Sequence, residues 1–231
     1  METTESTKKI TIIAEAGINH NGNIHDAISL AGAAKNAGAD AVKFQLFTKR
    51  ARPKGGRYIF QKENWQRLLD AIENKIRVFW SVFDFESVDL AKELGATWVK
   101  LSLVERRNLQ LIERCEKAGF ERKIMSVDLW GQYPKRPGWE YLYCPNNGWS
   151  GYYPTEFEHI EWQRYAQIAK ETGMGWSCHC EGFYESVIAA TFGAKIIEKH
   201  FQLPGSCPDA KVSVEPRQFR LMVDMIRQAE Q

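Results

Sequence analysis

A short apolar stretch near the C-terminus carries two side chains of the kind that do chemistry. Residues 195–201 read Lys-Ile-Ile-Glu-Lys-His-Phe, a run typical of a short buried strand. Side chains alternate between the two faces of a strand, so Glu198 and His200 share one face. Burying a carboxylate is costly unless it is paired or neutralised, which favours a functional site. The alternative at this point is an edge strand with solvated polar residues.

Polar residues late in five further predicted strands follow the same alternation. If those faces line one interior, lysines, serines, carboxylates and histidines gather at the ends of the strands. Agreement among several strands disfavours a solvated surface. The residues are Glu15, Lys43, Gln45, Lys100, Ser102, Ser126, Asp128, Ser177 and His179.

The two histidines of these sets come from neighbouring strands and are candidate metal ligands. His179 and His200 could both reach one divalent cation and leave open positions for water and substrate. Alternatively, each imidazole only makes hydrogen bonds within the fold. Cys178 and Cys180 flank His179, and thiolates favour a softer metal such as zinc or iron. Strand alternation points both cysteines away from His179.

The lysines and serines form a candidate anion site. Ammonium charges combined with hydroxyl donors suit a group such as phosphate, and ordinary ion pairing with the acidic residues is the alternative. Glu15 and Glu198 could transfer protons if burial and the lysines tune their pKa values. The proposed anion ligands are Lys43, Lys100, Ser126 and Ser177.

The elements that must position these residues alternate between strand and helix. Eight strands and about seven helices with short connections predict a (β/α)8 TIM barrel, whose active site lies at the carboxyl ends of the strands. We expect a disordered tail over residues 1–9 and one barrel domain over 10–231. The predicted strands are 10–17, 41–47, 77–84, 98–103, 123–129, 141–145, 174–179 and 195–201, and the helices are 24–37, 63–74, 87–94, 109–118, 160–172, 183–192 and 216–228.

One sector of the barrel departs from this pattern. Residues 130–140 contain two prolines and two glycines, so we expect no full helix after the fifth strand. Trp130, Trp139 and Trp149 in and beyond this sector either stack on a substrate or pack over the gap. Residues 49–57 form a basic loop, which either folds over an anionic substrate or is a solvated charge run.

Composition limits the compartment and the partners. The chain has 231 residues and a net charge of +2, which gives no reason to expect nucleic-acid binding. Five cysteines without a disulfide pattern suggest a reducing compartment. The first apolar run is too short to span a membrane, and no signal peptide is evident. We therefore expect a cytoplasmic protein with small-molecule partners and no membrane association.

Six motifs spread over the barrel resemble the sialic acid synthase (N-acetylneuraminate synthase) family, in the same order as in its barrel domain. The resemblance covers roughly residues 10–228. The motifs are 13–23 (IAEAGINHNGN), 38–45 (GADAVKFQ), 153–155 (YPT), 175–179 (GWSCH), 197–201 (IEKHF) and 208–216 (PDAKVSVEP).

The resemblance implies a condensation of phosphoenolpyruvate with an open-chain N-acylated amino sugar, with release of phosphate. It implies a divalent metal, Mn²⁺ first and Mg²⁺, Co²⁺ or Zn²⁺ as alternatives, held by His179 and His200. The lysines and serines above would bind phosphoenolpyruvate, and the two glutamates would act near the reacting carbons. Sugar-side positions match Gln45, Tyr153 and Asp209.

The chain also departs from the family. The family's C-terminal antifreeze-like domain, which supplies an arginine to the partner subunit's sugar site, has no counterpart up to Gln231. Because the sugar-side part is the altered one, we expect a nonulosonic acid made from an N-acylated amino sugar, with a pseudaminic- or legionaminic-type precursor or a non-sugar aldehyde as alternative acceptors. We also expect a homodimer. The alternatives are a metal-dependent barrel aldolase, isomerase or hydrolase acting on another phosphorylated or acidic substrate, and a non-catalytic binding subunit.

Overall fold

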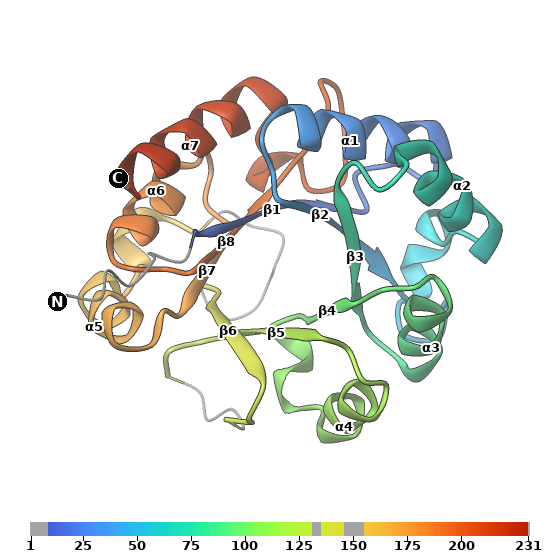
Figure 1. Cartoon of the computed structure of the whole chain (residues 1–231), viewed down its shortest axis with the longest axis horizontal. Coiled ribbons are helices and arrows are strands. Elements are labelled where there is room, and N and C mark those ends of the chain that lie inside the picture. Colours follow the sequence, from blue (N-terminus) through green and yellow to red (C-terminus); the bar gives the residue numbers. More distant parts are fainter. Residues whose placement is uncertain (1–8, 131–134, 146–154, 231) are drawn as a thin grey trace, which may run out of the picture.

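A computed structural model describes residues 9–130, 135–145 and 155–230 of the chain. The predicted tail lies outside the described residues except for Lys9. Eight parallel strands close into a barrel in the order of the sequence, so the predicted fold is confirmed (Figure 1). The strands are β1 (Thr11–Gly17), β2 (Ala41–Leu46), β3 (Arg77–Val82), β4 (Trp98–Leu101), β5 (Arg122–Val127), β6 (Trp139–Tyr143), β7 (Gly175–Cys178) and β8 (Ile196–His200).

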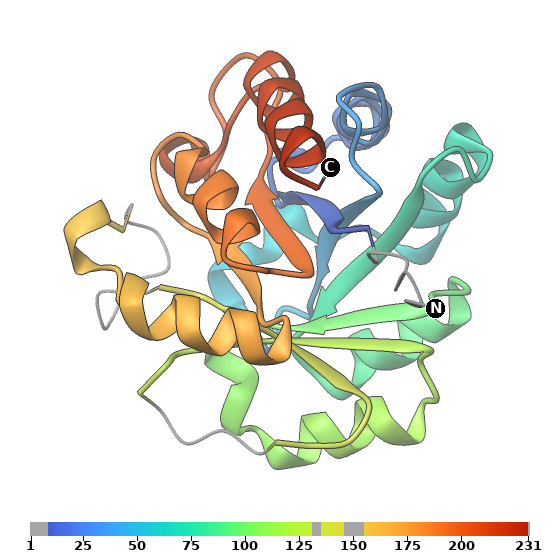
Figure 2. The same ribbon diagram turned by 60° about the vertical axis from the view of Figure 1, so that its left-hand side comes forward.

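Helices surround the strands, and the view turned by 60° shows them outside the barrel from that side as well (Figure 2). The α-helices are α1 (Ile24–Asn36), α2 (Lys62–Ile72), α3 (Phe85–Glu93), α4 (Leu109–Lys117), α5 (Trp162–Thr172), α6 (Tyr184–Thr191) and α7 (Pro216–Ala229). Short 3-10 helices η1 (Pro53–Tyr58), η2 (Val104–Arg107), η3 (Phe157–His159) and η4 (Ala210–Val212) lie in the connections. None of the helices in the described ranges combines the length and apolar character that a membrane crossing needs.

The described residues between β5 and β6 form no helix, as the prolines and glycines predicted. Among the described residues, α5 is therefore the next α-helix of the ring after α4 (Figure 1). Trp139 packs over part of this sector and is buried, and its indole N–H donates to Glu116 at 3.0 Å. The strand that contains it begins at Trp139 rather than at Tyr141, where the sequence predicted it.

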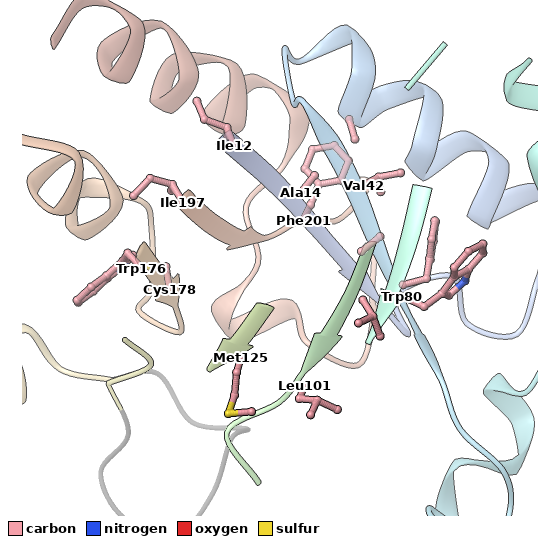
Figure 3. Close-up of a cluster of buried hydrophobic side chains, with 14 of the residues drawn as sticks. Ile12, Ala14, Val42, Trp80, Leu101, Met125, Trp176, Cys178, Ile197 and Phe201 are labelled. Atoms are coloured by element: carbon pink, nitrogen blue, oxygen red, sulfur yellow. The ribbon is translucent and has the colours of Figure 1, made fainter. Parts of the chain in front are cut away.

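The strand faces divide the barrel into an outer and an inner set of side chains. Outward-facing apolar side chains pack against the helices (Figure 3). The inner set begins with an apolar layer made of Ile13, Ala41, Phe79, Ile124, Leu142 and Ile196. One pleat further along the strands the inner residues become polar and remain buried. The apolar layer closes the barrel at one end, so the polar layer opens toward the carboxyl ends of the strands.

Candidate active site

The polar layer lies in a cavity of about 180 Å³ at the carboxyl ends of the strands. All predicted site residues except Tyr153 line it, and Tyr153 lies outside the described residues. The residues brought together are Glu15, Lys43, Gln45, Lys100, Ser126, Ser177, His179, Glu198, His200 and Asp209.

Strand register explains why these residues meet. In the parallel pairing Glu15 lies beside both Lys43 on β2 and His200 on β8, while Ser177 lies beside Glu198. In β8, Glu198 and His200 face the cavity and Ile197 packs in the outer core, as the period of two predicted.

Two lysines and two glutamates form an ion-pair network in the floor of the cavity. Lys100 donates to both carboxylate oxygens of Glu198 at 2.9 Å, and Ser177 Oγ donates to one of them at 2.9 Å. Lys43 forms an ion pair with Glu15, and its Nζ lies 3.7 Å from Glu198 Oε2. All four charged residues are at most 3% exposed. The pairing offsets the cost of burying these charges.

Burial and neighbouring charges shift these groups in different directions. Burial alone would raise the pKa of Glu198, but the Lys100 and Lys43 ammonium groups outweigh it and hold the pKa well below its usual value. Burial lowers the pKa of Lys100 despite the neighbouring Glu198 carboxylate. Burial would also lower the pKa of Lys43, but the carboxylates of Glu15 and Glu198 outweigh burial and raise this pKa. Glu198 is therefore an anion that accepts protons poorly.

The two candidate metal ligands lie side by side at the rim. The imidazole rings of His179 and His200 are 4.8 Å apart between centroids and nearly perpendicular. Burial, followed by the neighbouring His200, lowers the pKa of His179 to about 3, so its ring is neutral at neutral pH. His200 Nδ1 has no hydrogen-bond partner among the described residues and lies 3.5 Å from Asp209 Oδ2.

Asp209 is held against this pair by a buried asparagine. Asn19 Oδ1 accepts from the Asp209 backbone N–H at 3.1 Å, and its amide group donates to the Phe201 carbonyl at 2.9 Å. A Cβ at Gly17 would lie 3.0 Å from Glu15 Oε1 and 3.2 Å from Asp209 Oδ2, and Gly17 has a φ of +51°. Glycine at this position therefore permits the two carboxylates to approach the end of β1.

Ser81, Cys144 and Arg52 also line the cavity, and sequence reasoning did not single them out as site residues. Ser81 on β3 accepts from Lys43 Nζ at 3.3 Å, and Cys144 follows β6. Both occupy inward positions that strand alternation could have identified. Arg52 comes from the loop after β2, which the sequence predicted either to fold over an anionic substrate or to be a solvated charge run, and its guanidinium lies 4.0 Å from the Phe83 ring centroid. No ion pair joins Arg52 to a carboxylate in the described part of the chain.

The Arg52 loop is anchored by a helix cap. Asp84 caps α3 by accepting from the Ser87 backbone N–H at 2.7 Å. Its other oxygen accepts from the backbone N–H and the hydroxyl of Thr48 at 2.8 and 2.7 Å. The Arg52 backbone N–H in turn donates to the Thr48 carbonyl. The Arg52 guanidinium is thus held at the cavity by a fixed turn, within electrostatic range of the Asp209 carboxylate.

Other residues considered from sequence lie away from the cavity. Asp128 forms an ion pair with Arg106 at 2.7 Å and does not line the cavity. Trp139 packs over the sector without a helix and does not stack on a substrate, as one of the two alternatives predicted. Trp130 is exposed, and the Arg164 guanidinium lies over its ring. Trp149 lies outside the described residues. The tryptophans that the structure describes therefore contribute no stacking surface to the cavity.

Comparisons with known proteins agree with this architecture. A family model described as the NeuB family matches residues 149–231. N,N'-diacetyllegionaminic acid synthase of Campylobacter jejuni is 30% identical, over 96% of this chain and 77% of that protein. Human N-acetylneuraminate-9-phosphate synthase is 26% identical, over 95% and 70%. The crystal structure of N-acetylneuraminic acid synthetase from Leptospira borgpetersenii in complex with citrate has a TM-score of 0.84 and 22% identity, covering 100% of this chain and 88% of that one.

Proposed function

This chain belongs to the NeuB family, and we propose that it condenses phosphoenolpyruvate with the aldehyde of an N-acylated amino sugar to give a nonulosonic 2-keto acid and phosphate. The observation that carries the proposal is a single cavity in which Lys43 and Lys100 lie with His179 and His200. Relatives named as synthases of legionaminic, pseudaminic and neuraminic acids support this reaction class.

The reaction sets three requirements for the site. A carbon–carbon bond forms between C3 of phosphoenolpyruvate and the aldehyde carbon, whose oxygen takes up a proton and becomes a hydroxyl. Water adds at C2, and the bond between C2 and the phosphate oxygen breaks to leave the ketone. The site must therefore hold a highly charged anion, orient an aldehyde and move protons between water and the aldehyde oxygen.

We place the phosphoenolpyruvate anion at the floor of the cavity. We assign Lys43, Lys100, Ser126 and Ser177 to the phosphate and carboxylate of phosphoenolpyruvate, since ammonium and hydroxyl groups suit both. The two lysines are already compensated by Glu15 and Glu198. Net attraction for a polyanion must come from additional cations, and Arg52 is available at the same cavity.

The two glutamates are suited to different tasks. Glu198 is held as an anion by Lys100 and Lys43, which suits it to orient the ammonium groups rather than to accept protons. Glu15 pairs with Lys43 and lies next to Gly17, near Gln45 and Asp209. We assign proton transfer to Glu15 and contacts with the acceptor to Gln45, Asp209 and Tyr153.

The rim residues fit a divalent metal. His179 and His200 are adjacent, His200 has an unpartnered buried Nδ1, and the Asp209 carboxylate lies 3.5 Å away. Imidazole nitrogens suit divalent metals of the first transition row, and oxygen ligands from water or substrate, which suit Mn²⁺, would complete the coordination. When bound, such a metal supplies Lewis-acid polarisation of the aldehyde. His179 and His200 would hold it, and Asp209 would orient His200.

Calorimetric titration of phosphoenolpyruvate, with and without Mn²⁺, tests the donor half of this proposal. We expect Mn²⁺-dependent binding that Ser126→Ala, Lys43→Met and His200→Ala weaken. Lys123→Met is the matched control, because Lys123 donates to the Phe120 carbonyl and does not line the cavity. Circular dichroism establishes that each variant is folded. Absence of binding to the unaltered chain would refute the proposal.

Phosphate release tests the chemistry itself. The unaltered chain, Mn²⁺ and phosphoenolpyruvate are incubated with N-acylated amino sugars, with and without a phosphate group on the sugar. We expect phosphate release that requires an aldehyde and stops with Glu15→Gln. Binding of phosphoenolpyruvate without release for every aldehyde would instead favour a barrel enzyme of different chemistry.

A further inference from the structure

A second group of metal-binding side chains lies on the outer side of the barrel, behind β7. Cys178 ends this strand, Cys180 follows it, and Glu185 lies in the first turn of α6. The two sulfur atoms and a carboxylate oxygen all lie within 4.8 Å of one another. Figure 3 shows Cys178 beside Trp176 among the outward-facing side chains. His179, between the two cysteines, lines the cavity instead, so this group is separate from the proposed active site.

The group is buried, and one of its carboxylate oxygens has no hydrogen-bond partner among the described residues. Cys178 is fully buried, Cys180 is 1% exposed and Glu185 is 9% exposed. Glu185 Oε2 has no hydrogen-bond partner among the described residues. An orphaned carboxylate oxygen in such a place costs free energy unless a cation binds there.

A buried lysine completes the surroundings. Lys199 on β8 is fully buried, and its Nζ donates to the Cys180 carbonyl at 2.7 Å and to Cys178 Sγ at 3.5 Å. No carboxylate in the described ranges lies within ion-pair distance of this ammonium. When both thiols are deprotonated, as metal binding requires, the two thiolates, the Glu185 carboxylate and the Lys199 ammonium sum to two negative charges. One divalent cation would neutralise that sum.

We propose that Cys178, Cys180 and Glu185 bind a zinc ion. Two sulfur ligands favour zinc over the hard cations, and a carboxylate oxygen is an accepted third ligand. The fourth tetrahedral position is left to water, and the two thiol protons leave to solvent when the metal binds. Lys199 keeps its donation to Cys178 Sγ and orients that ligand from outside the coordination sphere.

The site ties the end of β7 to the start of α6. Because His179 lies between the two thiols, zinc bound there would fix the backbone that carries this imidazole into the cavity. The inference does not rest on the proposed reaction, since its ligands face away from the cavity.

Metal analysis of the reduced, zinc-loaded chain tests the site. The measurement is made on His200→Ala, which removes a ligand of the other candidate metal site. In this background we expect one zinc ion per chain, and a loss of affinity of about tenfold or more when Cys180→Ser or Glu185→Gln is added. Adding Cys207→Ser is the matched control, because this half-buried thiol donates to Gln202 and is not a member of the group. In the same background, absence of zinc, or zinc that Cys180→Ser leaves in place, would overturn the proposal.

Cobalt substitution keeps the test independent of any variant that fails to fold. Co²⁺ bound to the unaltered chain through two thiolates gives a thiolate-to-metal charge-transfer band and intense visible bands of tetrahedral cobalt. Cobalt spectra without the charge-transfer band would refute thiolate coordination whatever the outcome for phosphoenolpyruvate.

Discussion

Glu198→Gln is expected to destabilise the barrel through the lysine that Glu198 holds. Lys100 is 2% exposed and donates to both oxygens of this carboxylate at 2.9 Å. The substitution leaves a buried ammonium without its counterion, and breaking a buried pair from one side costs about 3–5 kcal/mol. At roughly 2–4 °C per kcal/mol for a chain of this size, Tm should fall by roughly 6–20 °C.

A double-mutant cycle separates the pair from the effect of either side chain alone. Lys100→Met/Glu198→Gln removes both charges, while Lys43 keeps its ion pair with Glu15. No ammonium is left uncompensated, so the double variant should be more stable than Glu198→Gln alone, with a coupling free energy of about 1–3 kcal/mol.

Urea unfolding followed by circular dichroism measures all four proteins at pH 7. If the losses of unfolding free energy in the two single variants add up to the loss in the double variant, the carboxylate and the ammonium do not interact in the native state. A Glu198→Gln variant as stable as the unaltered chain would refute the reasoning from burial.

Two further predictions concern Arg52 and His20. Arg52→Leu should weaken binding of phosphoenolpyruvate, or of a phosphorylated acceptor, by about 10–100-fold, because one charged hydrogen-bonding group is lost. Lys54→Leu, which changes an exposed residue of the same loop that does not line the cavity, should leave binding unchanged. Equal effects of the two substitutions in titration calorimetry would contradict this role of Arg52. Burial lowers the pKa of His20 to about 4 from 6.5, so its stabilising effect is complete above pH 6.5 and is lost as the pH falls toward 4, by up to about 3 kcal/mol. Urea unfolding at pH 7 and 4.5 should show a smaller acid loss in His20→Phe, and an unchanged loss would assign the acid sensitivity to other groups.

Local sequence patterns were sufficient to predict the barrel and the inner face of the strands that carry the site. Side-chain alternation is a local property of an extended chain, so Glu198 and His200 could be placed on one face without knowledge of any neighbour. The prolines and glycines of residues 130–140 likewise excluded a helix through local backbone geometry. Alternation also pointed Cys178 away from His179, as the structure has it.

The pairing of the buried charges depends on contacts between separate strands, which the sequence did not predict. The sequence did not distinguish the roles of Lys43 and Lys100. Barrel closure and strand register place Lys43 in an ion pair with Glu15 and Lys100 in an ion pair with Glu198. A period of two assigns a face, but it does not assign a neighbour on another strand.

Loop and helix contacts were equally beyond the sequence. Arg52 reaches the cavity because Thr48 is bound to the distant helix cap Asp84. Glu185 meets Cys178 and Cys180 only because α6 packs against β7. Such contacts depend on how separate elements dock, and the local pattern of residues does not encode that geometry.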